Sequence, residues 1–174
     1  MKDKASARIV SAMVLATETG QRQSDLLELL WSNVEADHIK ITQNKTGKKV
    51  SIRQSQELKD LLTSIKQQQG ESDIRSTHVL TNIHGKPWTQ DGFQTSWGRE
   101  KKKLGLTGLT FNDLRGTAIT RWAESGASVP EIAALSGHSL KDVEKILEQH
   151  YLSMSQKLGD RVILRMEQEQ KSQK

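Results

Sequence analysis

Apolar residues recur at helical spacing near the start of the chain. Ile9, Met13 and Ala16 fall on one stripe, and this period is typical of an amphipathic helix. The pattern predicts a helix over residues 5–17. Gly20 is expected to end it, because glycine readily adopts the left-handed backbone conformation that stops many helices.

Two further helices are expected in the next part of the chain. A short one over residues 24–30 would place Arg22 at the junction between two buried helices, where a side chain is held rigidly. Leucine and isoleucine at helical spacing predict another over residues 56–66. The polar stretch after it predicts a loop over residues 67–77.

Between these helices, two segments alternate apolar and polar residues. Residues 38–42 and 49–53 flank a turn that contains Gly47, which is the pattern of a β-hairpin. The hairpin would place Lys45 at an exposed tip. Residues 78–81 are expected to form a third short strand.

The second half of the chain carries several helix-start signals. Thr89 can cap a helix to about residue 104, and Asn112 precedes a helix to about residue 124. Together with the hairpin, these elements predict a fold that is mainly α-helical with a small antiparallel β-sheet, of the α+β class.

A tight corner between two helices is predicted further on. Ser128 and Glu131 form a capping box that starts a short helix, and Gly137 stops it. The next helix then leads towards Tyr151. His138 therefore lies at the corner itself.

Size and composition bound the possibilities. A chain of 174 residues can form one domain with its own core, and residues 155–174 are expected to add a strongly charged helix or tail. The absence of cysteine excludes disulfides and thiolate metal sites. The sequence has no apolar run of the length that a membrane span or a secretory signal needs, so a cytoplasmic location is expected.

The net charge gives a weaker indication. Lys and Arg number 26 against 21 Asp and Glu, which leaves a formal charge of +5. This excess favours a polyanionic partner. A mildly basic solvated surface would explain it equally well.

Four groups of polar residues follow one another in an order that suggests phosphate chemistry. They are Thr19-Gly20-Gln21-Arg22, Asn112-Asp113-Leu114-Arg115, Ser136-Gly137-His138 and Tyr151, the only tyrosine of the chain. Two arginines can bind the free oxygens of a phosphodiester in bidentate fashion, a histidine can add a hydrogen bond, and a phenol can attack the phosphorus.

With the Lys45-Thr46-Gly47 turn between the first two groups, this order resembles the catalytic domain of the tyrosine recombinases, the phage integrase family. The resemblance extends from about Ile9 to about Leu152, and its specificity comes from the ordered set of motifs. It implies that residues 1–174 are a single catalytic domain. The amino-terminal DNA-binding domain of the family is expected to be absent from this chain, because Arg22 comes so early.

The resemblance assigns roles to the arginines and the tyrosine. Arg22 and Arg115 would grip the scissile phosphate and stabilise the charge that develops on its oxygens. Tyr151 would be the nucleophile, and its alternative is a partly buried tyrosine with a bonded hydroxyl. The alternative for each arginine is a structural ion pair with the carboxylate of Glu18, Asp25 or Asp113.

Lys45 and His138 complete the implied site. Lys45 resembles the mobile lysine of the family, which protonates the departing 5′ oxygen, and a flexible charge on a turn suits a general acid. Lys48 and Lys49 are close competitors. His138 matches a histidine that hydrogen-bonds the phosphate or the nucleophile, and its alternative is to cap the corner between two helices.

The sequence departs from the family pattern at two points. The family usually has histidine where this chain has Asn112. An amide cannot transfer protons, so Asn112 would either hydrogen-bond the phosphate or only cap the helix that begins at Asp113. The second departure is the spacing of His138 and Tyr151, which exceeds the common spacing by about one helical turn.

The resemblance also implies a reaction and its partners. The tyrosine attacks a phosphodiester of double-stranded DNA, forms a 3′-phosphotyrosyl link and frees a 5′-hydroxyl, which attacks the link in a second duplex. Because the intermediate retains the bond energy, no ATP, metal or other cofactor is expected. The full-length protein is expected to act as a homo-tetramer on DNA, in the bacterial cytoplasm or nucleoid.

Phosphate contact or a solvated helix face would explain a basic run on the helix after Thr89, namely Arg99, Lys101, Lys102 and Lys103.

Two other functions stay open at this level. Residues 128–149 can form a helix-turn-helix module that binds the major groove without cleaving DNA, although few base-reading side chains occur there. A relaxing enzyme of the type IB topoisomerase kind would share the Arg, Lys, His and Tyr chemistry. A covalent protein–DNA adduct excludes the first, and relaxation of supercoils without strand exchange would favour the second.

Overall fold

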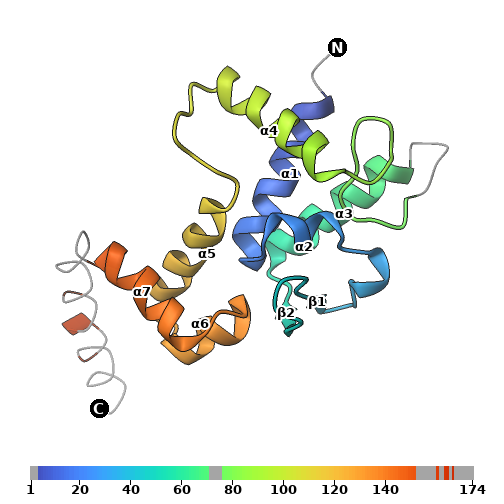
Figure 1. Cartoon of the computed structure of the whole chain (residues 1–174). Coiled ribbons are helices and arrows are strands. Elements are labelled where there is room, and N and C mark those ends of the chain that lie inside the picture. The colour runs from blue at the N-terminus through green and yellow to red at the C-terminus, as the bar shows by residue number, and fades with distance from the viewer. Residues whose placement is uncertain (1–3, 71–75, 152–159, 161–162, 165, 167–174) are drawn as a thin grey trace.

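The computed structural model describes residues 4–70 and 76–151, together with Asp160, Ile163, Leu164 and Met166. Within this part of the chain, the fold is mainly helical with one antiparallel pair of strands, as predicted (Figure 1). The elements in chain order are α1 (Lys4–Thr19), α2 (Gln23–Leu27), the 3-10 helix η1 (Trp31–Asn33), β1 (His38–Thr42), β2 (Lys49–Arg53), α3 (Gln56–Gly70), α4 (Gln90–Lys103), α5 (Asp113–Glu124), α6 (Val129–Ser136) and α7 (Leu140–Tyr151).

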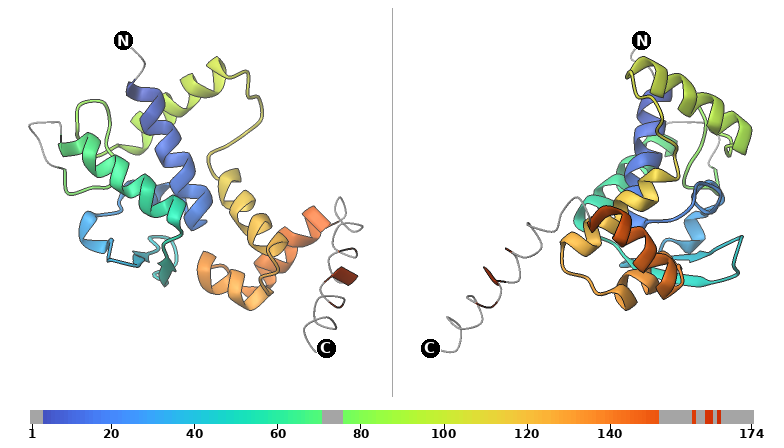
Figure 2. Two further views of the ribbon diagram at one scale, coloured as in Figure 1. Left: turned by 180° about the vertical axis from the view of Figure 1, so that it is seen from behind. Right: turned by 60° about the vertical axis from the view of Figure 1, so that its left-hand side comes forward.

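The buried apolar side chains form two clusters, and helix α1 lies at the centre of the first, which also includes side chains of α2, α3, α4 and both strands. It contacts α2, α3, α4 and α5, and both further views show it between these helices (Figure 2). Ile9, Ala12 and Leu15 on its apolar stripe are fully buried. The helix ends at Gly20, where φ is +63° and a Cβ would collide with the ring of Trp122 in α5. Glycine therefore allows the close approach of α1 and α5.

The β-hairpin has the bounds that the alternation predicts. Ile39 pairs with Ile52, and Ile41 pairs with Val50. All four side chains are buried, so one face of the hairpin packs into the first cluster. The prediction of a third strand at residues 78–81 is wrong, because this segment makes only isolated bridges to other loops.

The bounds of two helices differ from the predictions because of contacts with that same segment. Helix α2 ends at Leu27 rather than at residue 30, since the carbonyl of Leu29 accepts a hydrogen bond from Val79 N at 2.9 Å. Helix α3 continues to Gly70 rather than ending at residue 66. The buried Gln69 side chain holds this last turn, because its Nε2 donates to the carbonyl of Val79 at 2.9 Å.

Helices α5, α6 and α7 form the second hydrophobic cluster. Ile119, Ile132, Val143 and Leu147 are its buried members of largest volume. The predicted capping box at the start of α6 is present. Gly137 ends α6 with a φ of +71°, as predicted, and the corner that follows leads directly into α7.

The predicted charged helix or tail at residues 155–174 lies largely outside the described residues. In the part of the chain that the structure describes, no helix combines the length and the apolar character needed to cross a bilayer.

Candidate active site

Arg115 lies in the first turn of α5, and its guanidinium is buried against backbone carbonyls. Arg115 is only 6% exposed. Nη1 donates to the carbonyl of Gly20 and Nη2 donates to the carbonyl of Ser136, both at 2.8 Å. Arg115 therefore joins the end of α1 to the corner after α6, in addition to any role towards a ligand.

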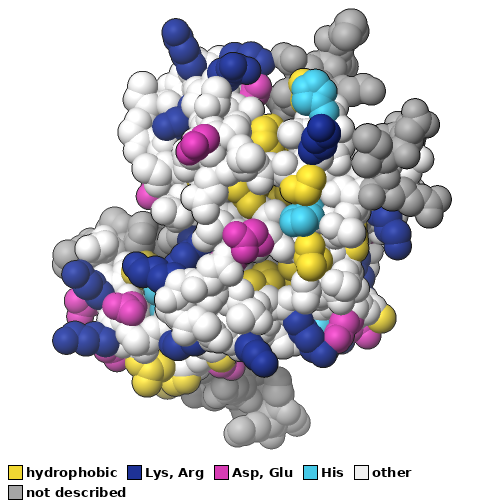
Figure 3. Space-filling view, turned by 45° about the vertical axis from the view of Figure 1, so that its right-hand side comes forward, with side chains coloured by type: hydrophobic (Ala, Val, Ile, Leu, Met, Phe, Trp, Pro, Cys, Tyr) yellow, Lys and Arg dark blue, Asp and Glu magenta, His cyan; other side chains and the backbone are white. Residues whose placement is uncertain are grey.

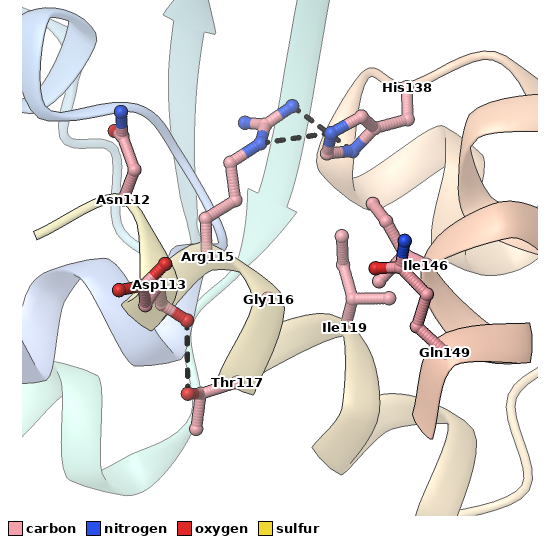
Figure 4. Close-up of a pocket in the computed structure, with 9 residues that line it drawn as sticks. All are labelled: Asn112, Asp113, Arg115, Gly116, Thr117, Ile119, His138, Ile146 and Gln149. Atoms are coloured by element: carbon pink, nitrogen blue, oxygen red, sulfur yellow. Dashed lines mark hydrogen bonds between the residues drawn. The ribbon is translucent and has the colours of Figure 1, made fainter. Parts of the chain in front are cut away.

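His138 faces the same guanidinium (Figure 4). Its Nε2 lies 3.3 Å from Arg115 Nε, and its Nδ1 lies 3.1 Å from Arg115 Nη2. A neutral imidazole has a single acceptor nitrogen, so the tautomer decides which of the two contacts is a hydrogen bond. The structure thus brings these two predicted site residues together.

Burial and like charges shift the pKa values of both residues. Burial, followed by the positive charge of Arg22, lowers the pKa of Arg115 to about 10, and Asp25 partly opposes this shift. Arg115 still remains charged at neutral pH. Burial and the charges of Arg115 and Arg22 lower the pKa of His138 to about 4. His138 is therefore neutral at pH 7, when it can hydrogen-bond a phosphate but holds no second proton to give away.

Arg22 lies between α1 and α2, as predicted, at the N-cap position of α2. Its side chain is 24% exposed. Nη1 donates to Gln43 Oε1 at 3.2 Å and lies 3.8 Å from the buried carboxylate oxygen Oδ2 of Asp25. Its charge is therefore only partly compensated and remains accessible to an anionic ligand.

The ion-pair alternative for the arginines is largely unsupported in the described part of the chain. Glu18 pairs with Arg121 at 3.2 Å, and Asp113 accepts a hydrogen bond from the backbone N of Thr110 at 2.6 Å. Only Asp25 approaches Arg22. Within the described residues, no carboxylate forms an ion pair with Arg115.

The structure does not bring Lys45 to the other predicted residues. Lys45 is exposed in the turn between β1 and β2. The competitor Lys48 reaches the corner instead, where its Nζ donates to the carbonyl of His138 at 3.3 Å. The role of general acid therefore remains a prediction for Lys45, and Lys48 is the residue to compare with it.

Asn112 occupies the N-cap position of α5 without acting as a side-chain cap. Its backbone is already helical, with φ −66° and ψ −22°, and its side chain makes no capping hydrogen bond. Asn112 is exposed and lines a pocket that Arg115 and His138 also line. This geometry favours the ligand role over the capping role.

The pocket lies between α5, α7 and the corner at His138, with a volume of about 440 Å³. Figure 4 shows Asn112 at one end, Arg115 and His138 along one side, and Ile119 facing Ile146 across the helix interface. The lining thus combines amide, guanidinium and imidazole groups with an apolar wall, and it also includes the carboxylate of Asp113, which accepts a hydrogen bond from Thr110 N. The guanidinium, imidazole and amide groups can donate hydrogen bonds to a tetrahedral oxyanion such as a phosphate.

Tyr151 is the last residue of α7, and its side chain lies outside the described part of the structure. Helix α7 packs against α5 and contributes Ile146 and Gln149 to the pocket. The residues that lengthen the spacing between His138 and Tyr151 belong to this continuous helix. The prediction that Tyr151 is the nucleophile stays a prediction.

The predicted basic run lies on α4, at the opposite end of the molecule from α6 and α7 (Figures 1 and 2). Two of its members have internal partners: Lys101 Nζ donates to the carbonyl of Leu109 at 2.6 Å, and Lys103 pairs with Glu100 at 3.0 Å. Figure 3 shows Lys and Arg spread over one face of the protein among acidic side chains, without a continuous patch. The structure does not bring Arg99, Lys101, Lys102 and Lys103 to the pocket.

Sequence reasoning missed a buried amide network behind the arginines. Gln21 is 1% exposed and Gln43 is fully buried, and Gln43 Nε2 donates to Gln21 Oε1 at 2.7 Å. A signal for Gln43 was present in the strand pattern. The alternation that turns Ile39 and Ile41 inwards also turns residue 43 inwards, and a polar residue at an inward position needs partners.

Comparisons with known proteins identify the family of this chain. The sequence model of the phage integrase family matches residues 1–157. The chain is 31% identical over 129 residues to a shufflon-specific DNA recombinase of Escherichia coli, an alignment that covers 71% of this chain and 30% of the relative.

Solved structures show the same fold. A lambda integrase dimer bound to a COC′ core site superposes with a TM-score of 0.69 at 25% identity, over 80% of this chain and 51% of that one. A lambda integrase tetramer bound to a Holliday junction gives a TM-score of 0.61 at 25% identity, over 76% of this chain and 41% of that one. The chain thus spans 30% of that recombinase and 51% and 41% of these two integrase chains. It belongs to the phage integrase family.

Proposed function

We propose that this chain is the catalytic part of a tyrosine recombinase, which cleaves and rejoins DNA strands in site-specific recombination. The observation that carries the proposal is the convergence of Arg115 and His138 from two separate helical segments, with Arg22 close enough to lower both of their pKa values. Membership of the phage integrase family and the recombinase name of the relative support the same reaction.

The proposed cleavage step uses the site as follows. Arg22 and Arg115 bind the non-bridging oxygens of the scissile phosphate and stabilise the charge that they gain in the transition state. The neutral His138 and the amide of Asn112 add hydrogen bonds. The phenol of Tyr151 passes its proton to water as its oxygen bonds to phosphorus, and the 5′ oxygen gains a proton from Lys45 as its bond to phosphorus breaks.

The positive charges of Arg22 and Arg115 favour the binding of an anion between them. Burial, and after it the positive charge of Arg22, lowers the pKa of Arg115, as expected where two like charges face one partly buried site. A phosphodiester between them would relieve this repulsion and add charge-assisted hydrogen bonds. The buried carboxylate of Asp25 supplies only part of the compensation, so the site retains a net preference for an anion.

The proposed partners are double-stranded DNA and further copies of the protein. One structural neighbour is an integrase tetramer on a Holliday junction, and another is an integrase dimer on a core site. Strand exchange joins two duplexes and so needs a nucleophile for each cleaved strand. For the full-length protein we therefore propose a homo-tetramer on DNA.

The function can be tested with nicked duplexes whose sequence around the nick is randomised. A nick close to the cleavage position makes the strand with the new 5′-hydroxyl very short. This strand diffuses away, so the covalent intermediate accumulates. The chain should form adducts that survive denaturation, with EDTA present and without nucleotide. Sequencing the DNA recovered from these adducts would give the preferred site.

Each alternative has its own outcome when this experiment is combined with assays on supercoiled plasmid and on pairs of intact duplexes that carry the selected site. DNA binding without any adduct would contradict the proposal and favour a helix-turn-helix binding module. An adduct accompanied by relaxation of supercoiled DNA but no exchange between two duplexes would favour a topoisomerase. Adducts together with exchanged strands would support the recombinase.

A further inference from the structure

One buried side chain, Gln43, joins the segments that carry the candidate phosphate-binding residues. Its Nε2 donates to Gln21 Oε1 at 2.7 Å and to the carbonyl of Ser136 at 2.8 Å. Its Oε1 accepts from Arg22 Nη1 at 3.2 Å and from Thr46 Oγ1 at 2.9 Å. The donors and the acceptor of this amide are thus fully used, by partners from the α1–α2 junction, the hairpin turn and the α6–α7 corner.

The same network reaches Arg115 through a shared acceptor. The carbonyl of Ser136 accepts from Gln43 Nε2 and from Arg115 Nη2, both at 2.8 Å. Gly137 makes room for this arrangement, because a Cβ at that position would collide with the amide of Gln43. Gln43 therefore contacts Arg22 directly and is a single carbonyl away from Arg115.

Arg22 needs such a support more than Arg115 does. Arg115 is held by two backbone carbonyls. Within the described residues, the side chain of Arg22 makes one hydrogen bond, to Gln43, and approaches one carboxylate, that of Asp25 at 3.8 Å. A long side chain with so few contacts would otherwise sample several rotamers.

We propose that Gln43 is a positioning residue of the strand-cleavage site, an inference that rests on the function proposed above. Its Oε1 fixes the guanidinium of Arg22 relative to Arg115, so that both can bind one phosphate. It does not touch the substrate. Its loss should therefore slow cleavage at saturating DNA while leaving the affinity for DNA nearly unchanged.

The hairpin offers a matched control in Gln54. It is also buried, and its Nε2 donates to the carbonyls of Glu35 and His38 at 2.7 and 3.2 Å, but it contacts none of the candidate site residues. Gln43→Met and Gln54→Met both remove a buried amide and keep the length of the side chain. A loss of stability alone should affect both variants.

The experiment measures single-turnover adduct formation on the selected nicked duplex, at saturating DNA and below the lowest melting temperature of the set. A second substrate carries sulfur in place of the 5′ leaving oxygen and needs no proton from a general acid. Gln43→Met should be roughly 10- to 100-fold slower than Gln54→Met on both substrates, as expected for a displaced binding group. Gln43→Asn, which keeps an amide but is too short to reach Arg22, should show the same defect if the methionine variant does not fold.

Other outcomes would contradict the inference in distinguishable ways. Equal rates for the variants at residues 43 and 54 would reduce Gln43 to a structural residue. Recovery of the Gln43 variant on the sulfur substrate would show that the amide acts through Thr46 and the lysine turn, not through Arg22. Absence of adducts with the unaltered chain would instead contradict the proposed function itself.

Discussion

Replacing Arg115 with lysine should lower both stability and cleavage, because the guanidinium serves two purposes. Lysine keeps the charge but has a single nitrogen in place of the planar fork. Its one nitrogen, on a shorter side chain, cannot occupy the positions of both guanidinium nitrogens, which lie 2.8 Å from the carbonyls of Gly20 and Ser136. The Ser136 carbonyl keeps Gln43 as a donor, whereas the Gly20 carbonyl depends on Arg115.

The expected loss in the free energy of unfolding follows from these contacts. Hydrogen bonds from charged donors contribute about 1.5–3 kcal/mol each, and Arg115→Lys loses one of them fully and another in part. We therefore expect a loss of about 2–4 kcal/mol in the free energy of unfolding. For a chain of this size that corresponds to a fall in Tm on the order of 10 °C. Loss of the bidentate grip on phosphate should slow cleavage by about 10²- to 10³-fold.

Arg121→Lys is the matched control on the same helix. Arg121 is 52% exposed and pairs with Glu18 at 3.2 Å, a contact that lysine can keep, so its stability should change by less than about 0.5 kcal/mol. Thermal unfolding and single-turnover adduct formation would be measured for both variants, the latter at a temperature where both are folded. An Arg115→Lys variant that is folded and cleaves within a few-fold of the unaltered chain would refute the phosphate grip. An unchanged Tm would refute the structural role.

Three further predictions concern the pocket and the hairpin. Because Asn112 makes no capping bond, Asn112→Ala should lose much less than the ~1 kcal/mol of a true cap yet cleave about 10²-fold more slowly, and Asn112→Asp should be worse; near-normal cleavage by the Asp variant would exclude phosphate contact. Lys45→Ala should cleave slowly on the normal duplex and recover on the sulfur substrate, with Lys48→Ala as the comparison; recovery of the Lys48 variant alone would transfer the general-acid role to Lys48. Burial lowers the pKa of His138 from 6.5 to about 4, so between these values the unfolded chain binds a proton that the native state does not, and stability falls as the pH decreases. His138→Gln should remove part of this acid-side fall in Tm, and parallel Tm–pH curves for the two proteins would contradict the burial of His138.

Local patterns predicted those elements whose signals lie within a few residues. The alternation over residues 38–42 and 49–53 identified both strands, because their buried faces are made of their own Ile and Val side chains. The capping box at Ser128 and the stop at Gly137 were also visible, since both depend on adjacent backbone groups.

Contacts between residues far apart in the sequence determine the helix ends and the amide network that local patterns did not predict. The end of α2 depends on the bond between Leu29 and Val79, and the last turn of α3 depends on the side chain of Gln69. Gln43 donates a hydrogen bond to a residue 93 positions away in the chain. Motif order can place Arg22 and Arg115 in one site, but only the fold shows which backbone carbonyls and amides hold them.

At the turn between β1 and β2, the motif and the structure indicate different lysines. Motif matching selects Lys45 from three neighbouring lysines, whereas the structure places the ammonium of Lys48 against the His138 carbonyl. An exposed turn makes few contacts that fix one lysine relative to another. Chemistry on a modified substrate, rather than geometry, has to decide between them.

The proposed reaction requires that the single tyrosine of this chain becomes joined to a DNA 3′ phosphate. The most direct measurement digests the trapped adduct with protease and nuclease and identifies the modified peptide by mass spectrometry, beside a Tyr151→Phe control. We expect one peptide that carries a 3′-phosphonucleoside on Tyr151, and no adduct from the Phe variant. An adduct that persists in Tyr151→Phe, or a modified peptide that excludes Tyr151, would contradict it.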